Sequence, residues 1–201
     1  MSNHRKKYNR ESKNRKEEDM FDYNLIDTID ISGSAPETEP MRQYYFMKKC
    51  RLWAEKEAEK MGRRLTLSMQ TMGCQMNARD SEKLEAVLTY IGYETVEETV
   101  ADFILYNTCT VRENANLKVY GRLGYMKNQK KKNPRMKIAM CGCMMQEPTV
   151  VEKIKKSYPF VDMIFGTHNV YKLAEILYTQ IQSERMVIDI WQEAIYFEIC
   201  I

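Results

Sequence analysis

The chain has 201 residues, of which 29% are charged and 44% hydrophobic, a composition typical of one soluble globular domain with an appendage. Its 31 basic and 28 acidic residues leave a net charge of only +3, which argues against a strongly basic nucleic-acid-binding protein but allows a local basic patch. The sequence contains no run of about 18 apolar residues and no N-terminal signal peptide, so we expect a cytoplasmic protein without a membrane partner. In that reducing compartment its six cysteines are metal ligands or buried thiols rather than disulfides.

The first forty residues are predicted to be a polar extension. Residues 1–19 cannot bury enough apolar surface to offset the entropy of ordering, so we expect disorder there. Residues 20–33 carry scattered apolar side chains that allow loose docking, and residues 34–40 have the composition of a linker. Residues 41–61 are predicted to form a helix that Gly62 ends, with Cys50 inside it as a buried thiol.

From residue 63 to 190 predicted strands alternate with predicted helices. The strands cover 63–70, 102–109, 136–143 and 161–167, and the helices cover 78–92, 111–131, 148–158 and 169–181. Asn77 or Asp80 is expected to cap the first of these helices, and residues 93–100 allow a short extra strand. We therefore predict an α/β domain, a three-layer parallel sheet with helices on both faces and a flavodoxin-like strand order. Residues 191–201 are interpreted as an aberrant tail.

Three cysteines occupy the same place relative to the predicted elements. Cys74, Cys109 and Cys143 each follow a strand and precede a helix, at separations of 35 and 34 residues. Because the carboxyl ends of parallel strands lie at one edge of a sheet, the three thiols are predicted to converge beside helix N-termini, which lower thiol pKa values. Three thiolates in a largely apolar pocket favour an iron–sulfur cluster, and a cubane cluster with three protein ligands would keep one iron open.

Two other interpretations of these cysteines stay open. They are packing residues, because cysteine is among the most buried residue types, or they bind zinc with His168 as a fourth ligand. In either case the protein would be a non-catalytic flavodoxin-like module that binds RNA or another partner. Cys141 shares a strand face with Cys143, but Gly142 marks the strand end and favours Cys143 as the ligand, with Cys141 in the strand core.

Other polar residues are candidates for supporting roles. Asn77 and Asn107 are expected to order the cysteine loops by hydrogen bonding to the backbone. Arg112 is placed to pair with the negative charge of a cluster or with a substrate phosphate. A basic patch comprises Lys130, Lys131, Lys132 and Arg135. It either contacts RNA phosphates or complements a helix dipole.

Three motifs resemble the N-terminal domain of the tRNA methylthiotransferase family. They are TMGCQMN at 71–77, NTCTVRE at 107–113 and GCMMQ at 142–146, and the GCQMN form is closest to the MiaB type. The resemblance implies that Cys74, Cys109 and Cys143 hold an auxiliary [4Fe-4S] cluster whose open iron carries the sulfur of a methylthio group. It also implies addition of that group to C2 of N6-isopentenyladenosine next to the anticodon. A paralogue that acts on threonylcarbamoyladenosine is the alternative.

The resemblance further implies parts that this sequence does not contain. Family members have a central radical-SAM domain, where a second [4Fe-4S] cluster cleaves S-adenosylmethionine, and a C-terminal TRAM domain. No CxxxCxxC motif occurs in the 201 residues, so we expect a chain truncated before the radical-SAM domain and inactive alone. The implied partners are the anticodon stem-loop of tRNA and the iron–sulfur assembly machinery, and the intact enzyme is expected to be a monomer.

Overall fold

The chain forms a six-stranded parallel sheet. The computed structural model describes residues 21–110 and 115–190, with the side chains of 115–117 excepted. The strands are β1 (Thr66–Met72), β2 (Glu94–Thr95), β3 (Phe103–Thr108), β4 (Lys137–Cys141), β5 (Met163–Phe165) and β6 (Val187–Asp189). Every neighbouring pair is parallel, in the spatial order β2-β1-β3-β4-β5-β6. This is the flavodoxin-like order with β6 added at one edge.

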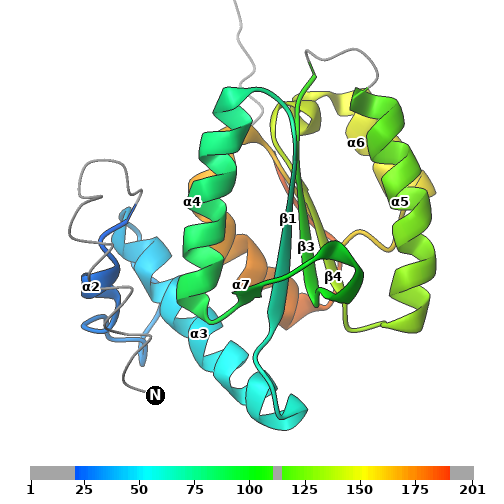
Figure 1. Ribbon diagram of the computed structural model, residues 1–201. Coiled ribbons are helices and arrows are strands. Elements are labelled where there is room, and N and C mark those ends of the chain that lie inside the picture. Colours follow the sequence, from blue (N-terminus) through cyan, green and yellow to red (C-terminus); the bar gives the residue numbers. More distant parts are fainter. Residues whose placement is uncertain (1–20, 111–114, 191–201) are drawn as a thin grey trace, which may run out of the picture.

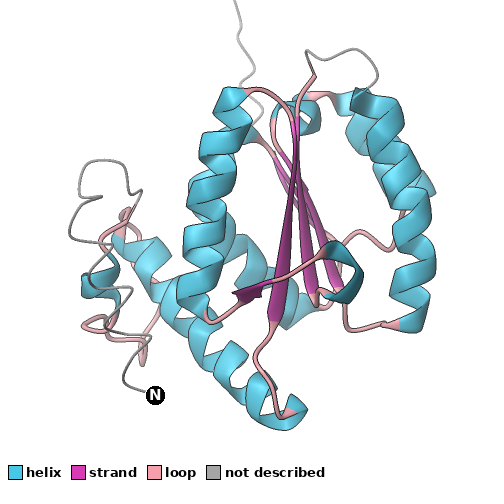
Figure 2. Cartoon of the chain, in the orientation of Figure 1, coloured by secondary structure: helices cyan, strands magenta, loops and turns pink. Residues whose placement is uncertain are grey.

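Helices cover both faces of this sheet (Figures 1 and 2). One face carries α3 (Met41–Met61), α4 (Gln75–Ile91) and α7 (Leu173–Ser183), and the other carries α5 (Ala115–Lys132) and α6 (Pro148–Ser157). Four shorter helices complete the described part: α2 (Tyr23–Ile26), η2 (Glu98–Val100), η3 (Cys143–Gln146) and η4 (Thr167–Lys172). The predicted three-layer α/β architecture is therefore confirmed.

The two faces of the central strands enter two separate hydrophobic cores. Phe103 and Leu105 of β3 pack among side chains of α3, α4 and α7, whereas Ile104 and Tyr106 pack against α5 and α6. All six residues of β3 are buried. Successive strand side chains point to opposite faces, so an uninterrupted apolar strand is what a sheet covered on both sides requires.

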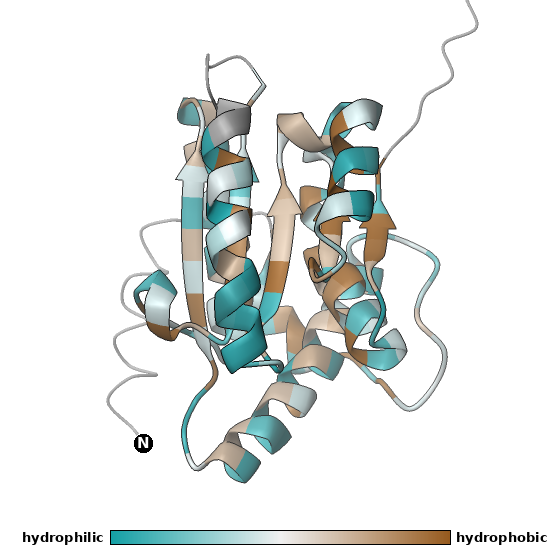
Figure 3. Ribbon diagram, turned by 90° about the vertical axis from the view of Figure 1, so that its right-hand side faces the viewer, coloured by the Kyte–Doolittle hydropathy of each residue, from teal (hydrophilic) through white to brown (hydrophobic). Residues whose placement is uncertain are grey.

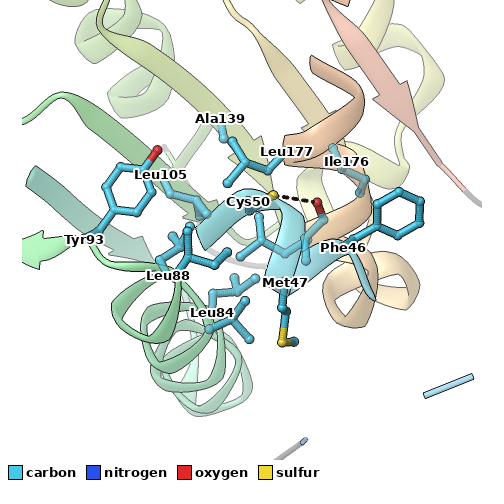
Figure 4. Close-up of a cluster of buried hydrophobic side chains, with 14 of the residues drawn as sticks. Phe46, Met47, Cys50, Leu84, Leu88, Tyr93, Leu105, Ala139, Ile176 and Leu177 are labelled. Carbon is cyan, nitrogen blue, oxygen red and sulfur yellow. Dashed lines mark hydrogen bonds between the residues drawn. The ribbon is translucent and has the colours of Figure 1, made fainter. Parts of the chain in front are cut away.

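Helix α3 belongs to the first of these cores rather than to an appendage. Met47 and Cys50 are completely buried between α4 and α7 (Figure 4), and the Cys50 thiol donates a hydrogen bond to the carbonyl oxygen of Ala174 at 3.3 Å. The segment before α3 is docked as well, because Phe21 and Ile26 are buried in the same core. The predicted disordered residues 1–19 lie outside the described residues.

Residues 34–40, which have the composition of a linker, are held against α3. The guanidinium group of Arg42 donates to the carbonyl oxygen of Pro36 at 3.2 Å and forms an ion pair with Glu175 of α7. The Tyr45 hydroxyl donates to the carbonyl oxygen of Gly33 at 2.9 Å. These contacts join the segment before α3 to the helical layer.

Three details differ from the sequence expectation. The predicted cap of α4 was wrong, because the N-cap is Cys74, while Asn77 occupies the third helical position and Asp80 the sixth. The fourth predicted helix starts later than expected, after the 3-10 helix η4. Residues 187–189 form the edge strand β6, where the sequence analysis predicts no strand. The predicted tail at 191–201 lies outside the described residues.

Candidate metal centre

The loops that carry the three cysteines emerge from adjacent strands at one edge of the sheet. Cys74 follows β1, Cys109 directly follows β3, and Cys143 is the first residue of η3 after β4. Because β1, β3 and β4 are neighbours in the sheet, their carboxyl ends bring these loops together at the upper edge in Figure 1. The backbone N–H of Cys109 donates to the carbonyl oxygen of Met72 at 3.1 Å, which ties the first two loops to each other.

Cys74 is the most exposed of the three cysteines. Its side chain is exposed at the N-terminus of α4, where the backbone N–H of Asn77 lowers the pKa of the thiol, with further contributions from the N–H of Met76 and the side chain of Cys109. Free N–H groups in the first turn of a helix stabilise a thiolate.

The other cysteines differ in burial. Cys109 is 1% exposed, and Cys143 is partly exposed. Cys141 is fully buried in β4, and burial raises the pKa of its thiol well above the usual range. Strand β4 ends at Cys141, so the structure places Cys141 in the strand core, as the sequence predicted, and Cys143 in the loop at the sheet edge.

A buried amide network holds the cysteine loops in register. The Asn77 side chain donates to Oδ1 of Asn107 at 2.9 Å, and the Asn107 side chain donates back to the carbonyl oxygen of Asn77 at 2.9 Å. Asn77 Oδ1 also accepts the backbone N–H of Cys74 at 3.2 Å. Both amide side chains are at most 1% exposed, where such paired hydrogen bonds are costly to lose.

Two residues of this network escaped the sequence analysis. Ser81 accepts a hydrogen bond from the Asn107 side chain at 3.1 Å and another from the Thr71 hydroxyl at 2.7 Å. Thr108 donates from its hydroxyl to the carbonyl oxygen of Cys141 at 2.8 Å, which links the β3 loop to the β4 loop. The available signal for Ser81 was its spacing of four residues from Asn77, which places both on one face of a helix.

Glycines allow the loops to approach one another. Gly142 has a φ of 97°, and a Cβ atom there would lie 2.3 Å from the carbonyl oxygen of Thr108 and 2.5 Å from Oδ1 of Asn107. At Gly73 a Cβ atom would lie 2.2 Å from Oδ1 of Asn77. Only glycine fits at these two positions, directly before Cys74 and Cys143.

The described part of the chain contains no group of three or more His, Cys, Asp or Glu side chains close enough to hold a single metal ion. A single zinc ion needs all its sulfur ligands about 2.3 Å from one point. A cubane cluster binds each thiolate through a different iron, so its ligands stand wider apart. His168 lies exposed in η4, which follows β5 at the same edge of the sheet.

The remaining candidate residues are placed away from the cysteines or outside the described residues. Arg112 falls in the part that is not described. The basic patch lies at the carboxyl end of α5 and in the loop that follows, at the opposite edge of the sheet, where Figure 3 shows the helix in hydrophilic colour. Lys130 is half-buried in an ion pair with Asp162 at 2.5 Å, whereas Lys131, Lys132 and Arg135 are exposed. None of the described helices is long and apolar enough to cross a bilayer.

Comparison with known proteins agrees with the motifs. A protein named tRNA-2-methylthio-N(6)-dimethylallyladenosine synthase from Lachnoclostridium phytofermentans is 61% identical over 144 residues, 72% of this chain and 32% of the relative. Proteins of the same name from Clostridioides difficile and Acetivibrio thermocellus are 54% and 49% identical over 68% and 76% of this chain, and 29% and 32% of their own lengths. The chain thus spans about a third of the length of these relatives.

The resemblance to the tRNA methylthiotransferases is confirmed over about 70% of the chain. A family model also matches residues 66–166, which run from the start of β1 to the end of the β5 strand and contain all three cysteine loops. By that match the chain belongs to the family described as Uncharacterized protein family UPF0004.

Proposed function

We propose that Cys74, Cys109 and Cys143 hold a [4Fe-4S] cluster, and that the chain is the auxiliary-cluster part of a tRNA methylthiotransferase. The observation that carries this proposal is the meeting of three cysteine loops at one edge of adjacent strands. Buried Asn77 and Asn107 join the first two loops, and Thr108 joins the third. A structural cysteine would not need an exposed side chain with a lowered pKa, which Cys74 has.

The donor set fits such a cluster. Three thiols supply soft ligands, which iron–sulfur clusters require. The backbone N–H groups at the start of α4 favour the thiolate form of Cys74, and Gly73 and Gly142 leave the space that side chains would fill. Cys141 is left out of this set because it is the last residue of β4, in the strand core, whereas Cys143 lies in the loop at the sheet edge.

The chain's own residues have distinct tasks in this proposal. Asn77 and Asn107 fix the spacing between the Cys74 and Cys109 loops. Thr108 fixes the Cys143 loop against the Cys109 loop through its hydrogen bond to the carbonyl oxygen of Cys141. With three protein ligands, a bound cluster would offer one open iron that can carry the sulfur for transfer. Arg112 is proposed to balance its negative charge.

The substrate proposal comes from the relatives. Their name indicates that they act on N6-dimethylallyladenosine in tRNA, and we propose the same methylthiolation at C2, next to the anticodon, for the protein to which this chain contributes. The 201 residues contain no CxxxCxxC motif for the second cluster that cleaves S-adenosylmethionine, so this chain alone is proposed to be inactive. A threonylcarbamoyladenosine substrate is the alternative; mass spectrometry of tRNA from a deletion strain distinguishes the two by the nucleoside that lacks its methylthio group.

The cluster proposal is tested by anaerobic reconstitution of the chain with iron and sulfide. We expect about four irons per chain, a brown protein and the Mössbauer spectrum of a cubane cluster. Cys74→Ser, Cys109→Ser and Cys143→Ser should each lose or destabilise the cluster. Cys50→Ala is the matched control, because that thiol is buried in the helical layer away from the sheet edge.

Two results would contradict this assignment. A zinc-loaded, colourless protein with no iron uptake would favour the structural-zinc alternative. If Cys143→Ser retains a full cluster and Cys141→Ser does not, the third ligand is Cys141 rather than Cys143. A circular dichroism spectrum of each variant shows whether loss of iron reflects loss of folding.

The exposed basic residues carry a second proposal. We propose that Lys131, Lys132 and Arg135 contact tRNA phosphates, while Lys130 is held in place by Asp162. A Lys131→Glu/Lys132→Glu variant should then bind tRNA less tightly, with a shallower salt dependence than the unaltered chain. If the variant and the unaltered chain bind tRNA with equal affinity and equal salt dependence, these residues do not contact phosphates. Their remaining role is then to complement the dipole of α5.

The five described cysteines are not joined in disulfides, and we propose a reducing cytoplasmic location for the protein. We also propose cluster loading by the iron–sulfur assembly machinery and a monomeric intact enzyme. Cell fractionation and sedimentation of the intact enzyme test these points, and a dimer in sedimentation would contradict the last.

A further inference from the structure

Two buried polar atoms near the cysteine loops lack hydrogen-bond partners. They are Nε2 of Gln146 and Oγ1 of Thr167, and the other such atom among the described residues is Oε1 of Gln43 in α3. A buried donor without a partner costs about 1–3 kcal/mol, so such groups call for an explanation. An absent ligand is one such explanation.

Gln146 shares its short helix with Cys143. Cys143 is the first residue of η3 and Gln146 the last. A 3-10 helix has three residues per turn, so side chains three positions apart lie on the same face. The side chain of Gln146 therefore projects from the same side of η3 as the thiol of Cys143.

Gly166 brings the second donor to the same place. A Cβ atom on Gly166 would lie 2.1 Å from Nε2 of Gln146, so the amide group rests against the turn between β5 and η4. Thr167 follows Gly166 directly and begins η4. Strands β4 and β5 are paired, which places both donors at the edge of the sheet that carries the cysteine loops.

The missing partner must be a hydrogen-bond acceptor, because an amide nitrogen only donates. We propose that Gln146 and Thr167 donate hydrogen bonds to the sulfur atoms of the group held at Cys143, either the Cys143 thiolate or an inorganic sulfide. They are positioning residues, and this inference rests on the proposed cluster site. Hydrogen bonds to cluster sulfurs help to set the reduction potential. Such hydrogen bonds stabilise the reduced cluster, which carries more negative charge, and so raise the reduction potential.

The test compares reduction potentials of the reconstituted full chain in an anaerobic titration followed by electron paramagnetic resonance. Gln146→Met and Thr167→Val keep side-chain size and remove a donor, so both should shift the potential to more negative values, and the double variant should shift it further. Thr167→Ser keeps the hydroxyl and should retain the potential of the unaltered chain. Thr179→Val, on the exposed side of α7, is the matched control.

A second measurement uses the cluster-free protein. Because the Thr167 hydroxyl has no partner there, Thr167→Val should leave the urea midpoint unchanged or raise it. A lowered midpoint would show that the hydroxyl already has a partner without the cluster, and would overturn the inference.

The outcomes separate this inference from the proposed function. A cluster that assembles normally with the same potential in Gln146→Met and Thr167→Val overturns the donor role and leaves the cluster site standing. If the unaltered chain assembles no cluster, both the proposed cluster site and the donor role of Gln146 and Thr167 are overturned. If Gln146→Met does not fold, the comparison of Thr167→Val with Thr167→Ser decides the question.

Discussion

At the scale of single residues, the same thiol group has opposite properties in different places. The N–H of Asn77 lowers the pKa of exposed Cys74, whereas burial raises the pKa of Cys50. We expect iodoacetamide to modify Cys74 far faster than Cys50 in the cluster-free protein, with a half-maximal rate at a pH below the pKa of an unperturbed thiol. Peptide mass spectrometry across a pH series measures both rates, and equal rates at the two cysteines would contradict the assignment.

Gly142 is the residue on which the close approach of two loops depends. Gly142→Ala requires an L side chain at a φ of 97° and a contact of 2.3 Å with the carbonyl oxygen of Thr108. We expect the free energy of unfolding, measured by urea denaturation, to fall by about 1–3 kcal/mol.

The same substitution elsewhere supplies the control. Gly124 lies exposed within α5, and a Cβ atom there would meet nothing within 4 Å. Gly124→Ala should therefore raise the free energy of unfolding by about 0.5–1 kcal/mol, because alanine favours the helix. Loss of stability in both variants would mean that the backbone at Gly142 is not the cause.

At the scale of elements, α3 is an integral part of the first core. Met47 is fully buried, whereas Leu52 on the same helix is 43% exposed. Met47→Ala should cost about 2–5 kcal/mol in the free energy of unfolding. Leu52→Ala should stay within about 1 kcal/mol. Equal small losses in urea denaturation would show that α3 is only loosely attached.

The elements differ in how far the sequence predicts them. The four central strand–helix units follow from buried apolar strands and amphipathic helices, because both faces of the sheet impose these patterns. The sequence does not predict the three residues of β6 as a strand, since so short an edge segment shows no periodic pattern of apolar residues. The cap of α4 was assigned to the commoner capping residues, whereas the structure uses Cys74 backed by Asn77.

The candidate site divides in the same way. The three cysteine positions were predictable, because parallel topology alone sends strand ends to one edge. The role of Ser81 was not, since its hydroxyl meets Asn107 and Thr71 only after α4 packs on the sheet. Gln146 ends the GCMMQ motif, but the missing partners of Gln146 and Thr167 were not predictable, because a missing hydrogen bond is a property of the folded state.

At the scale of the whole molecule, partly buried carboxylates join segments far apart in the chain. Asp102, before β3, accepts hydrogen bonds from Arg63 and from the backbone of Thr66 at the start of β1. Glu175 of α7 accepts from Arg42 of α3. Burial alone would raise the pKa of each carboxyl group, but these donors outweigh it and lower both values.

The fold should therefore lose stability in acid. The unfolded pKa values of Asp and Glu are about 3.9 and 4.3, and the folded values are lower, so the unfolded chain binds more protons in that range. The stabilisation is fully present above these unfolded values and is lost as pH falls through the folded ones. Urea denaturation should give a constant contribution from about pH 7 to about 5 and a decline below about 4.

Asp102→Asn isolates one of these groups. It removes the titrating carboxylate, so the free energy of unfolding should be lower near neutral pH and should decline less steeply in acid than in the unaltered chain. Glu59→Gln, at an exposed position of α3, is the matched control and should keep the original slope. An unchanged acid slope in Asp102→Asn would mean that this carboxylate is not what links the amino ends of β1 and β3 to the stability of the whole sheet.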